Sequence, residues 1–210
     1  DDLATEALRR GAQDYLVKGQ FDRRMLLRAI RYAIERQRSE AQLRRQRERE
    51  TALRDVAEAV ASTLDLDTLL NLFLDKFESL FSNLAFTARL VDPKTGSLEP
   101  FAFRNVEEIG WGSGPSAYRD VRARAVMALG NPLVLVDLLS DPHLGNSHFI
   151  KRNGFVSYVG IPLVAKGISI GVIGVYSKER HEFDRDEVEF FGALGRQAAV
   201  AIYNSRIHEQ

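Results

Sequence analysis

The feature that most constrains the fold is a stretch without glycine or proline that covers residues 20–91. Because these two residues break helices most strongly, a stretch this long without either favours long, uninterrupted helices. Leu26, Ile30 and Ile34 recur at helical spacing, and Asp22 can cap a helix that begins near Arg23. The sequence therefore predicts a long helix at the start of this stretch.

The apolar stripe of this helix fades over residues 35–50, where six arginines and four glutamates dominate. Charged neighbours four residues apart keep such a segment helical but give it no face to bury. The stripe resumes between Leu53 and Leu64. Two arrangements fit, a solvated single helix or one strand of a parallel two-stranded coiled coil, and the resumed stripe favours the coiled coil.

Composition limits the function classes. Hydrophobic residues make up 45% of the chain, enough for a packed core, and 29 basic residues balance 29 acidic ones, which gives no electrostatic reason to expect nucleic acid or an anionic membrane as partner. No apolar run is long enough to span a bilayer and no signal peptide is visible, so we expect a cytoplasmic protein. The chain contains no cysteine, which excludes thiol catalysis, disulfides and thiolate metal sites. It starts without methionine, as expected for a piece of a longer protein.

The later part of the chain alternates helices and strands. The pattern of apolar residues, glycines and prolines predicts helices over residues 68–81, 116–129 and 185–207, and strands over 83–92, 97–104, 133–136, 156–164 and 168–176. Residues 137–154 read as a polar loop with one helical turn. Lys166-Gly167 is typical of a tight hairpin turn, and Asp184 is a cap for the last helix. This order fits an α+β fold with an antiparallel sheet and helices packed on it.

Residues 3–36 carry the pattern Gly-Ala-Gln-Asp-Tyr-Leu-Val-Lys at 11–18, followed by a helix. This pattern resembles the C-terminal third of a bacterial response-regulator receiver, here a strand plus a helix. The resemblance implies that Lys18 corresponds to the receiver lysine that contacts the phosphoryl group. The aspartate that accepts the phosphoryl group in receivers would lie before Asp1, so we expect no phosphorylation of this fragment by that mechanism.

Residues 52–208 resemble a GAF domain. The stretches that carry the resemblance are 130–137 with 141–142, 154–163, 167–175 and 183–188. The resemblance implies a GAF-like antiparallel sheet with a ligand cavity on one face and terminal helices, which usually dimerise, on the other. We therefore divide the chain into a receiver fragment (1–36), a helical linker (37–51) and a GAF domain (52–208).

In GAF domains the central strands and the loop before the fourth strand bound the cavity, and that loop is 137–155 here. The ligand-binding residues that the resemblance implies are Arg89, Phe103, Trp111, Tyr118, Asp137, Ser140, His143, His148, Ser157 and Tyr158. No metal or cofactor is predicted, because His143 and His148 have no recognised metal spacing. Bilin-attaching GAF domains use a cysteine, which is absent here. The cyclic-nucleotide signature is present only in degraded form at 177–187, where a helix start explains the acidic residues more simply.

These observations predict a non-catalytic module of a two-component or phosphorelay protein. It would sense an unidentified small molecule and pass the signal through its terminal helices to an output domain, such as a histidine kinase. No catalytic arrangement of residues is visible. We expect a homodimer through the terminal helices, without nucleic acid or membrane. The alternative is a structural dimerisation module that binds no ligand.

Overall fold

A computed structural model describes residues 6, 9–10, 12, 19, 21–62, 66–107, 116–140 and 148–208 of the chain. Within the described residues, the chain divides into two units at residues 50 and 51. The helices are α2 (Arg23–Ser62), α3 (Leu66–Leu80), α4 (Ser116–Leu129), α5 (His148–Asn153) and α6 (Arg185–His208). The strands are β1 (Leu84–Val91), β2 (Leu98–Arg104), β3 (Leu133–Leu135), β4 (Ser157–Ala165) and β5 (Ile168–Ser177).

The first unit contains most of the long helix predicted from the glycine- and proline-free stretch. Asp22 caps α2, since its Oδ1 accepts a hydrogen bond of 2.7 Å from the Met25 amide. Ion pairs four residues apart, such as Arg36–Glu40 and Arg44–Glu48, follow its charged middle. The strand predicted at residues 14–18 lies outside the described residues, so the receiver fragment stays a prediction.

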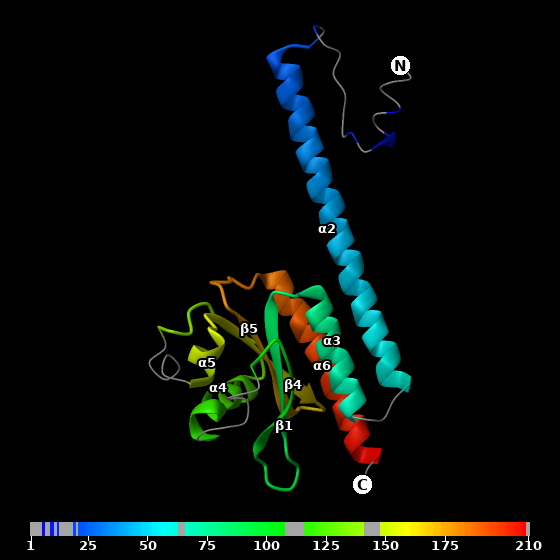
Figure 1. Ribbon diagram of the computed structural model, residues 1–210. Helices are drawn as coiled ribbons and strands as arrows, with labels where there is room; N and C mark the ends of the chain where they lie inside the picture. The colour runs from blue at the N-terminus through cyan, green and yellow to red at the C-terminus, as the bar shows by residue number, and fades with distance from the viewer. Residues whose placement is uncertain are drawn as a thin grey trace. The chain divides into compact units, whose positions relative to one another are not determined.

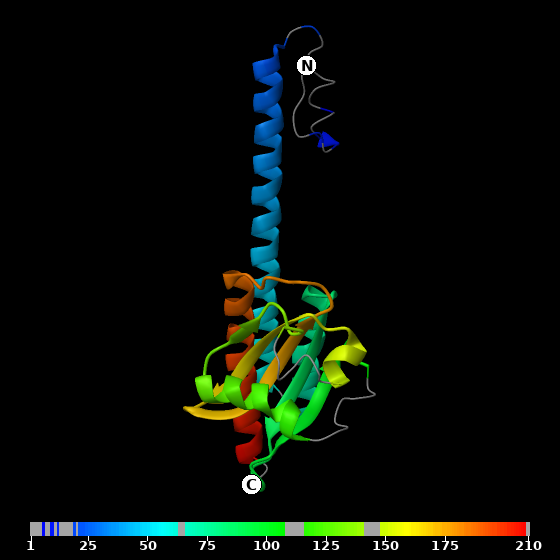
Figure 2. The ribbon, with the colours of Figure 1, turned by 90° about the vertical axis from the view of Figure 1, so that its left-hand side faces the viewer.

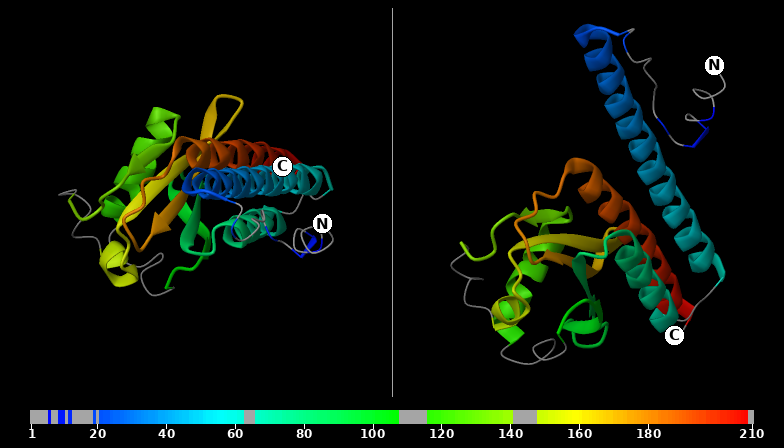
Figure 3. Two further views of the ribbon diagram at one scale, coloured as in Figure 1. Left: turned by 90° about the horizontal axis from the view of Figure 1, so that it is seen from above. Right: turned by 45° about the horizontal axis from the view of Figure 1, so that its top comes forward.

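The second unit is built on one five-stranded antiparallel sheet with strand order β2-β1-β5-β4-β3. The predicted α+β fold with an antiparallel sheet and helices is confirmed. In Figure 1, α3 and α6 lie on one face of this sheet and α4 and α5 on the other. Figure 2 looks onto the face that α4 crosses, and Figure 3 shows α3 and α6 together on the opposite side of the sheet.

Alternation along the strands explains why helices cover both faces. Leu84, Phe86, Ala88 and Leu90 of β1 point to the face of α3 and α6, where they join one large apolar core. Stacked and tilted rings fill that core, with Phe77 lying 5.2 Å from Phe86 between ring centroids. The last turns of α2 join the same core through Ala52, which is 5% exposed, and an ion pair of 2.6 Å between Asp55 and Lys76 ties them to α3.

Two predicted local motifs are confirmed. Lys166 and Gly167 both have positive φ, at 49° and 77°, which is the two-residue turn that suits a twisted hairpin. At the start of α6 the Asp184 carboxylate accepts a hydrogen bond from the Glu187 amide at 2.7 Å, and the Glu187 carboxylate accepts one from the Asp184 amide at 3.0 Å. This reciprocal capping explains the acidic residues there without a nucleotide.

Candidate functional site

A trough runs across the centre of the sheet on the face that α4 covers. Thr87 of β1 pairs with Gly174 of β5, which pairs with Gly160 of β4. Two residues along the strands, on the same face, Tyr158 pairs with Tyr176, and both rings lie over the glycines. A Cβ on Gly160 would lie 2.9 Å from Tyr158 Cζ, and a Cβ on Gly174 would lie 2.9 Å from Tyr176 Cε2. The two glycines therefore leave the space in which the phenol ends of the tyrosines lie.

Helix α4 closes this trough. Val126 of α4 is fully buried, and Arg122, one turn earlier, stacks its guanidinium 4.9 Å from the centroid of the Tyr158 ring. Together these elements line a partly open cavity of about 20 Å³, which we call the inner cavity. The described residues that line it are Thr87, Arg89, Arg122, Ala123, Tyr158, Val172, Gly174 and Tyr176.

The inner cavity is basic and rich in hydrogen-bond donors. Arg89 and Arg122 both line it, and no carboxylate stands among its described lining residues. The Nε and Nη1 atoms of Arg122 are shielded from solvent and have no hydrogen-bond partner. Burial raises the pKa of the Tyr158 phenol, Tyr176 adds to that rise, and the two arginines oppose it. The phenol therefore stays protonated at neutral pH and remains a donor.

Arg89 lies at an irregularity in the pairing of β1 with β2. The register between β1 and β2 shifts between Ala88 and Arg89, whose partners are Ala102 and Pro100, so that Phe101 is left unpaired. A bulge of this kind bends the strand and changes the direction of the neighbouring side chains. The charged residue of β1 that sequence reasoning singled out thus follows directly after a bulge.

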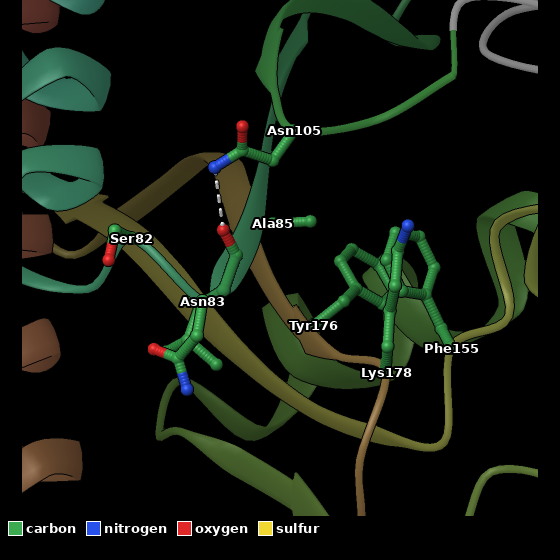
Figure 4. Close-up of a pocket in the computed structure, with 8 residues that line it drawn as sticks. Ser82, Asn83, Ala85, Asn105, Phe155, Tyr176 and Lys178 are labelled. Carbon is green, nitrogen blue, oxygen red and sulfur yellow. Dashed lines mark hydrogen bonds between the residues drawn. The ribbon is translucent and has the colours of Figure 1, made fainter.

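A second and larger hollow lies at the end of the sheet, on the other side of Tyr176; we call it the outer hollow. It has a volume of about 370 Å³ and is lined by Ser82, Asn83, Leu84, Ala85, Asn105, Phe155, Tyr176 and Lys178. Figure 4 shows Tyr176, Phe155 and Lys178 grouped on one side, and the bond of 3.0 Å that Asn105 Nδ2 donates to the Leu84 carbonyl. The Tyr176 ring stacks on Phe155 at 4.7 Å. Tyr176 is shared by the inner cavity and the outer hollow.

The structure brings two of the predicted ligand-binding residues, Arg89 and Tyr158, together in the inner cavity. Phe103 of β2 pairs with Thr87 of β1 and is partly buried, but it is not among the residues that line either hollow. Asp137 and Ser140 form a turn, in which Asp137 Oδ1 accepts hydrogen bonds from the amides of residues 139 and 140 at 3.0 and 3.2 Å. These bonds form the described turn at 137–140.

Ser157 has a structural task in this molecule. Its hydroxyl donates to the Val136 carbonyl at 2.7 Å and accepts from the His181 amide at 2.9 Å, which ties β4 to two neighbouring segments. His148 is exposed at the start of α5. Three further predicted residues, Lys18, Trp111 and His143, lie outside the described residues; Tyr118 belongs to α4, and its side chain lies outside the description. For all these positions a role in ligand binding stays a prediction.

Sequence reasoning missed Thr87, Arg122, Gly174 and Tyr176. A signal for Arg122 exists, because an arginine four residues before the buried Val126 lies on the apolar stripe of α4. Thr87 alternates with Arg89 on one face of β1, so alternation from Arg89, which the family resemblance implied, would have indicated Thr87. Among the described residues no group of three or more His, Asp or Glu side chains gathers as a metal site would require. Nor does any described helix have the length and apolar character that crossing a bilayer demands.

An antiparallel sheet that carries two long helices on one face and holds a polar cavity under a third helix on the other defines a class of α+β domain. The family model of the GAF domain matches residues 48–202, and the chain therefore belongs to the GAF family. A comparison with curated proteins found no match.

Solved structures show the same fold. A free methionine-R-sulfoxide reductase from Neisseria meningitidis, in complex with its substrate, is 20% identical with a TM-score of 0.63, over 76% of this chain and 91% of that chain. A methyl-accepting chemotaxis protein is 18% identical with a TM-score of 0.57, over 73% and 98%. The phycocyanobilin-bound GAF domain of a cyanobacterial phytochrome is 17% identical with a TM-score of 0.62, over 77% and 97%. At this level of identity the likeness concerns the fold alone.

Proposed function

We propose that this chain is a non-catalytic sensor module that binds a small molecule between the sheet and α4 and relays its presence through α2 and α6. The observation that carries the proposal is the inner cavity, in which polar donors are held under a helix without a compensating acceptor for Arg122. Relatives with the GAF fold serve in signalling proteins, including a chemotaxis protein and a phytochrome. A concave site with a few convergent polar groups is the arrangement that small-molecule binding requires.

A short physical route from the cavity to α6 supports the relay. Gly160 faces the trough, and the next residue of β4, Ile161, points to the opposite face and packs on α6. The contact is close, because a Cβ on Gly195 of α6 would lie 2.7 Å from Ile161 Cγ2. A shift of β4 on ligand binding would therefore move α6 directly, with no soft layer between them. The end of α2, which shares the same core through Ala52, would respond with it.

We propose no catalysis by this chain itself. The sequence contains no cysteine, which excludes thiol chemistry. Among its described lining residues the inner cavity offers threonine and tyrosine hydroxyls but no carboxylate or histidine that would serve as a general base.

The signalling context that we propose is a two-component or phosphorelay protein. The Gly-Ala-Gln-Asp-Tyr-Leu-Val-Lys pattern at 11–18 supports a receiver fragment in which Lys18 would face the phosphoryl site. An output domain such as a histidine kinase would then read the movement of α6. Phosphate transfer to the complete protein from a small phosphodonor tests this context, and failure to label any receiver aspartate would contradict it.

Exposed apolar side chains support a homodimer through the terminal helices. On α2 the residues Leu26, Ile30 and Ile34 are 37%, 47% and 45% exposed at helical spacing. We expect sedimentation of a dimer, and a monomer for the double variant Leu26→Glu/Ile30→Glu. The matched control is Arg28→Glu, on the charged face of the same helix, which should stay dimeric. A monomeric parent chain would refute this part of the proposal.

The sensor proposal is tested by a thermal-shift screen of small metabolites against the whole chain, followed by distance measurement. Because the chain has no cysteine, Arg124→Cys on α4 and Glu189→Cys on α6, both exposed, give one unique pair of spin-label sites. A binding metabolite should raise the melting temperature and change the distance between the two labels. If no metabolite does either, the structural dimerisation module becomes the better account.

A further inference from the structure

The charge of the inner cavity carries a more specific inference about what it binds. Arg122 brings a permanent positive charge, since a guanidinium does not lose its proton in a protein. Its Nε and Nη1 atoms are shielded from solvent without a hydrogen-bond acceptor, and its described partner is the face of the Tyr158 ring. A second guanidinium, that of Arg89, lines the same space. Holding the shielded charge of Arg122 there without an anion is costly, and the second positive charge of Arg89 adds to the positive potential of the cavity.

The neutral groups around the cavity are also suited to an anion. The Tyr158 phenol keeps its proton, and Tyr176 and Thr87 add two more hydroxyls to the lining. Hydrogen bonds from such donors to a charged acceptor are stronger than those to a neutral one. An uncharged ligand would leave the charge of Arg122 uncompensated, whereas an anion would satisfy the guanidinium and the hydroxyls together.

The size of the cavity limits the anion. A volume of about 20 Å³ is little more than the roughly 10–15 Å³ that one buried water needs. This space depends on Gly174, because a Cβ there would lie 2.7 Å from Thr87 Oγ1. The cavity as it stands holds little more than one water, so a carboxylate or oxoanion group needs a small movement of the lining side chains, and a larger ligand would need the outer hollow beyond Tyr176 for its remainder.

We propose that the inner cavity binds a compact carboxylate or oxoanion group through the guanidinium groups of Arg122 and Arg89. This inference rests on the proposed function, because it names the ligand class of the same sensor cavity. The anionic group is either the whole ligand or the charged end of a longer carboxylate whose body lies in the outer hollow. The compact anion and the longer carboxylate would both bind the guanidinium groups in the same way, and they differ in the length of the ligand.

The test compares anions with uncharged molecules of the same shape on the whole chain. Calorimetry and thermal shift are measured with sodium formate, acetate, nitrate and succinate, and with formamide and acetamide as neutral counterparts. We expect the anions to bind and to raise the melting temperature, and the amides to have no effect. Tighter binding of succinate than of acetate would indicate the longer ligand, and equal binding would indicate that the compact ion is sufficient; either result supports the anion.

Two variants separate specific binding from a general effect of salt. Arg122→Gln removes the charge and should weaken anion binding about tenfold or more, as expected for the loss of a charged hydrogen-bond donor. Arg124→Gln removes a charge from the exposed side of the same helix and should leave binding unchanged. If Arg122→Gln does not fold, Arg122→Lys keeps the charge and should retain part of the affinity.

The outcomes distinguish this inference from the proposal on which it depends. Equal effects of anions on the parent chain and on Arg122→Gln would overturn the anion site. Binding of uncharged metabolites in the absence of anion binding would also overturn it and leave the sensor function standing. No binding by any anion or any metabolite would overturn both.

Discussion

The two faces of the sheet differ in how they are packed and in the polarity of the residues that they bury. On the face of α3 and α6, apolar side chains form one continuous core in which Phe73, Phe77 and Phe191 are 1% exposed or less. On the face of α4 and α5, two smaller clusters stand apart, one around Phe149 and Tyr176 and the other around Val126 and Val172. Thr87, Arg89 and Arg122 lie at the inner cavity on this second face.

This contrast indicates a division of tasks within one sheet. The face of α3 and α6, which we call the dry face, supplies most of the buried apolar area and hence most of the stability. The other face gives up close packing for two hollows and keeps cationic groups out of water, which costs free energy until a ligand compensates them. If this reading is right, substitutions on the two faces should differ in the sign of their effect on the stability of the ligand-free chain.

The largest effect is expected from truncation of the dry core. Phe77→Ala removes a ring that is fully buried and packs on Phe86 and Phe191. The free energy of unfolding should fall by about 3–5 kcal/mol, because the cavity left behind adds to the lost transfer free energy. Denaturant titration followed by circular dichroism measures the change. Phe103→Ala, at a partly buried position of β2, is the control and should lower the free energy of unfolding less. An equal fall for both variants would contradict a special contribution of the core at Phe77.

A smaller effect is expected where α6 touches the sheet. Gly195→Ala would place a Cβ 2.7 Å from Ile161 Cγ2, so the unfolding free energy should fall by about 1–3 kcal/mol through overpacking. Gly192→Ala is a matched control one turn away, where the nearest atom would be a guanidinium nitrogen of Arg196 at 3.4 Å. Because alanine favours helix over glycine, this control should raise stability by up to about 1 kcal/mol. Equal signs for the two variants would contradict the close approach of α6 to β4.

The second face should respond in the opposite direction. Arg122→Leu removes the guanidinium, two of whose nitrogens are shielded from solvent, and leaves an apolar side chain on the same stripe of α4 as Val126. In the absence of anions the unfolding free energy should rise by about 1 kcal/mol, since the buried charge is removed while the contact with the Tyr158 ring is lost. Denaturation in buffers with and without acetate checks this sign. A loss of stability without any anion would show that Arg122 serves the packing of α4 instead of a ligand.

The dry face was predictable from sequence because its signals are local and periodic. The helices predicted over 68–81 and 185–207 and the cap at Asp184 follow from spacing and capping chemistry, and the structure confirms them as α3, α6 and the start of α6. The alternation in β1 also placed Phe86 on one face and Arg89 on the other.

The site was less predictable because it depends on contacts between elements distant in sequence. Arg122 comes to Tyr158 only when α4 crosses β4 and β5, and no local pattern fixes that crossing. The family resemblance implied Ser157 as a ligand contact; in the structure its hydroxyl donates to the Val136 carbonyl, and a contact with a ligand stays a prediction. A register shift of one residue moves a side chain to the other face of a sheet, and the sequence does not state the register.

The smallest effect is expected at the turn between β1 and β2. The Asp92 carboxylate accepts hydrogen bonds from the amides of Lys94 at 2.7 Å and Thr95 at 3.1 Å. These two bonds lower the pKa of Asp92 below 3.8, because they stabilise the charged form. The folded chain therefore gains stability from this carboxylate above the pKa of the unfolded state, and loses it as pH falls through the lower folded value.

The Asp92 carboxyl resonance, followed by NMR from neutral to acidic pH, should titrate below 3.8, and Asp92→Asn should abolish this part of the acid sensitivity. Because Asp92 belongs to the turn after β1 and does not line the inner cavity, anion binding by Asp92→Asn at neutral pH should match that of the parent chain. A weakened affinity would mean that the β1–β2 hairpin, and not the glycine trough alone, sets the shape of the cavity. The contrast between the two faces would then have to include the hairpin that joins them.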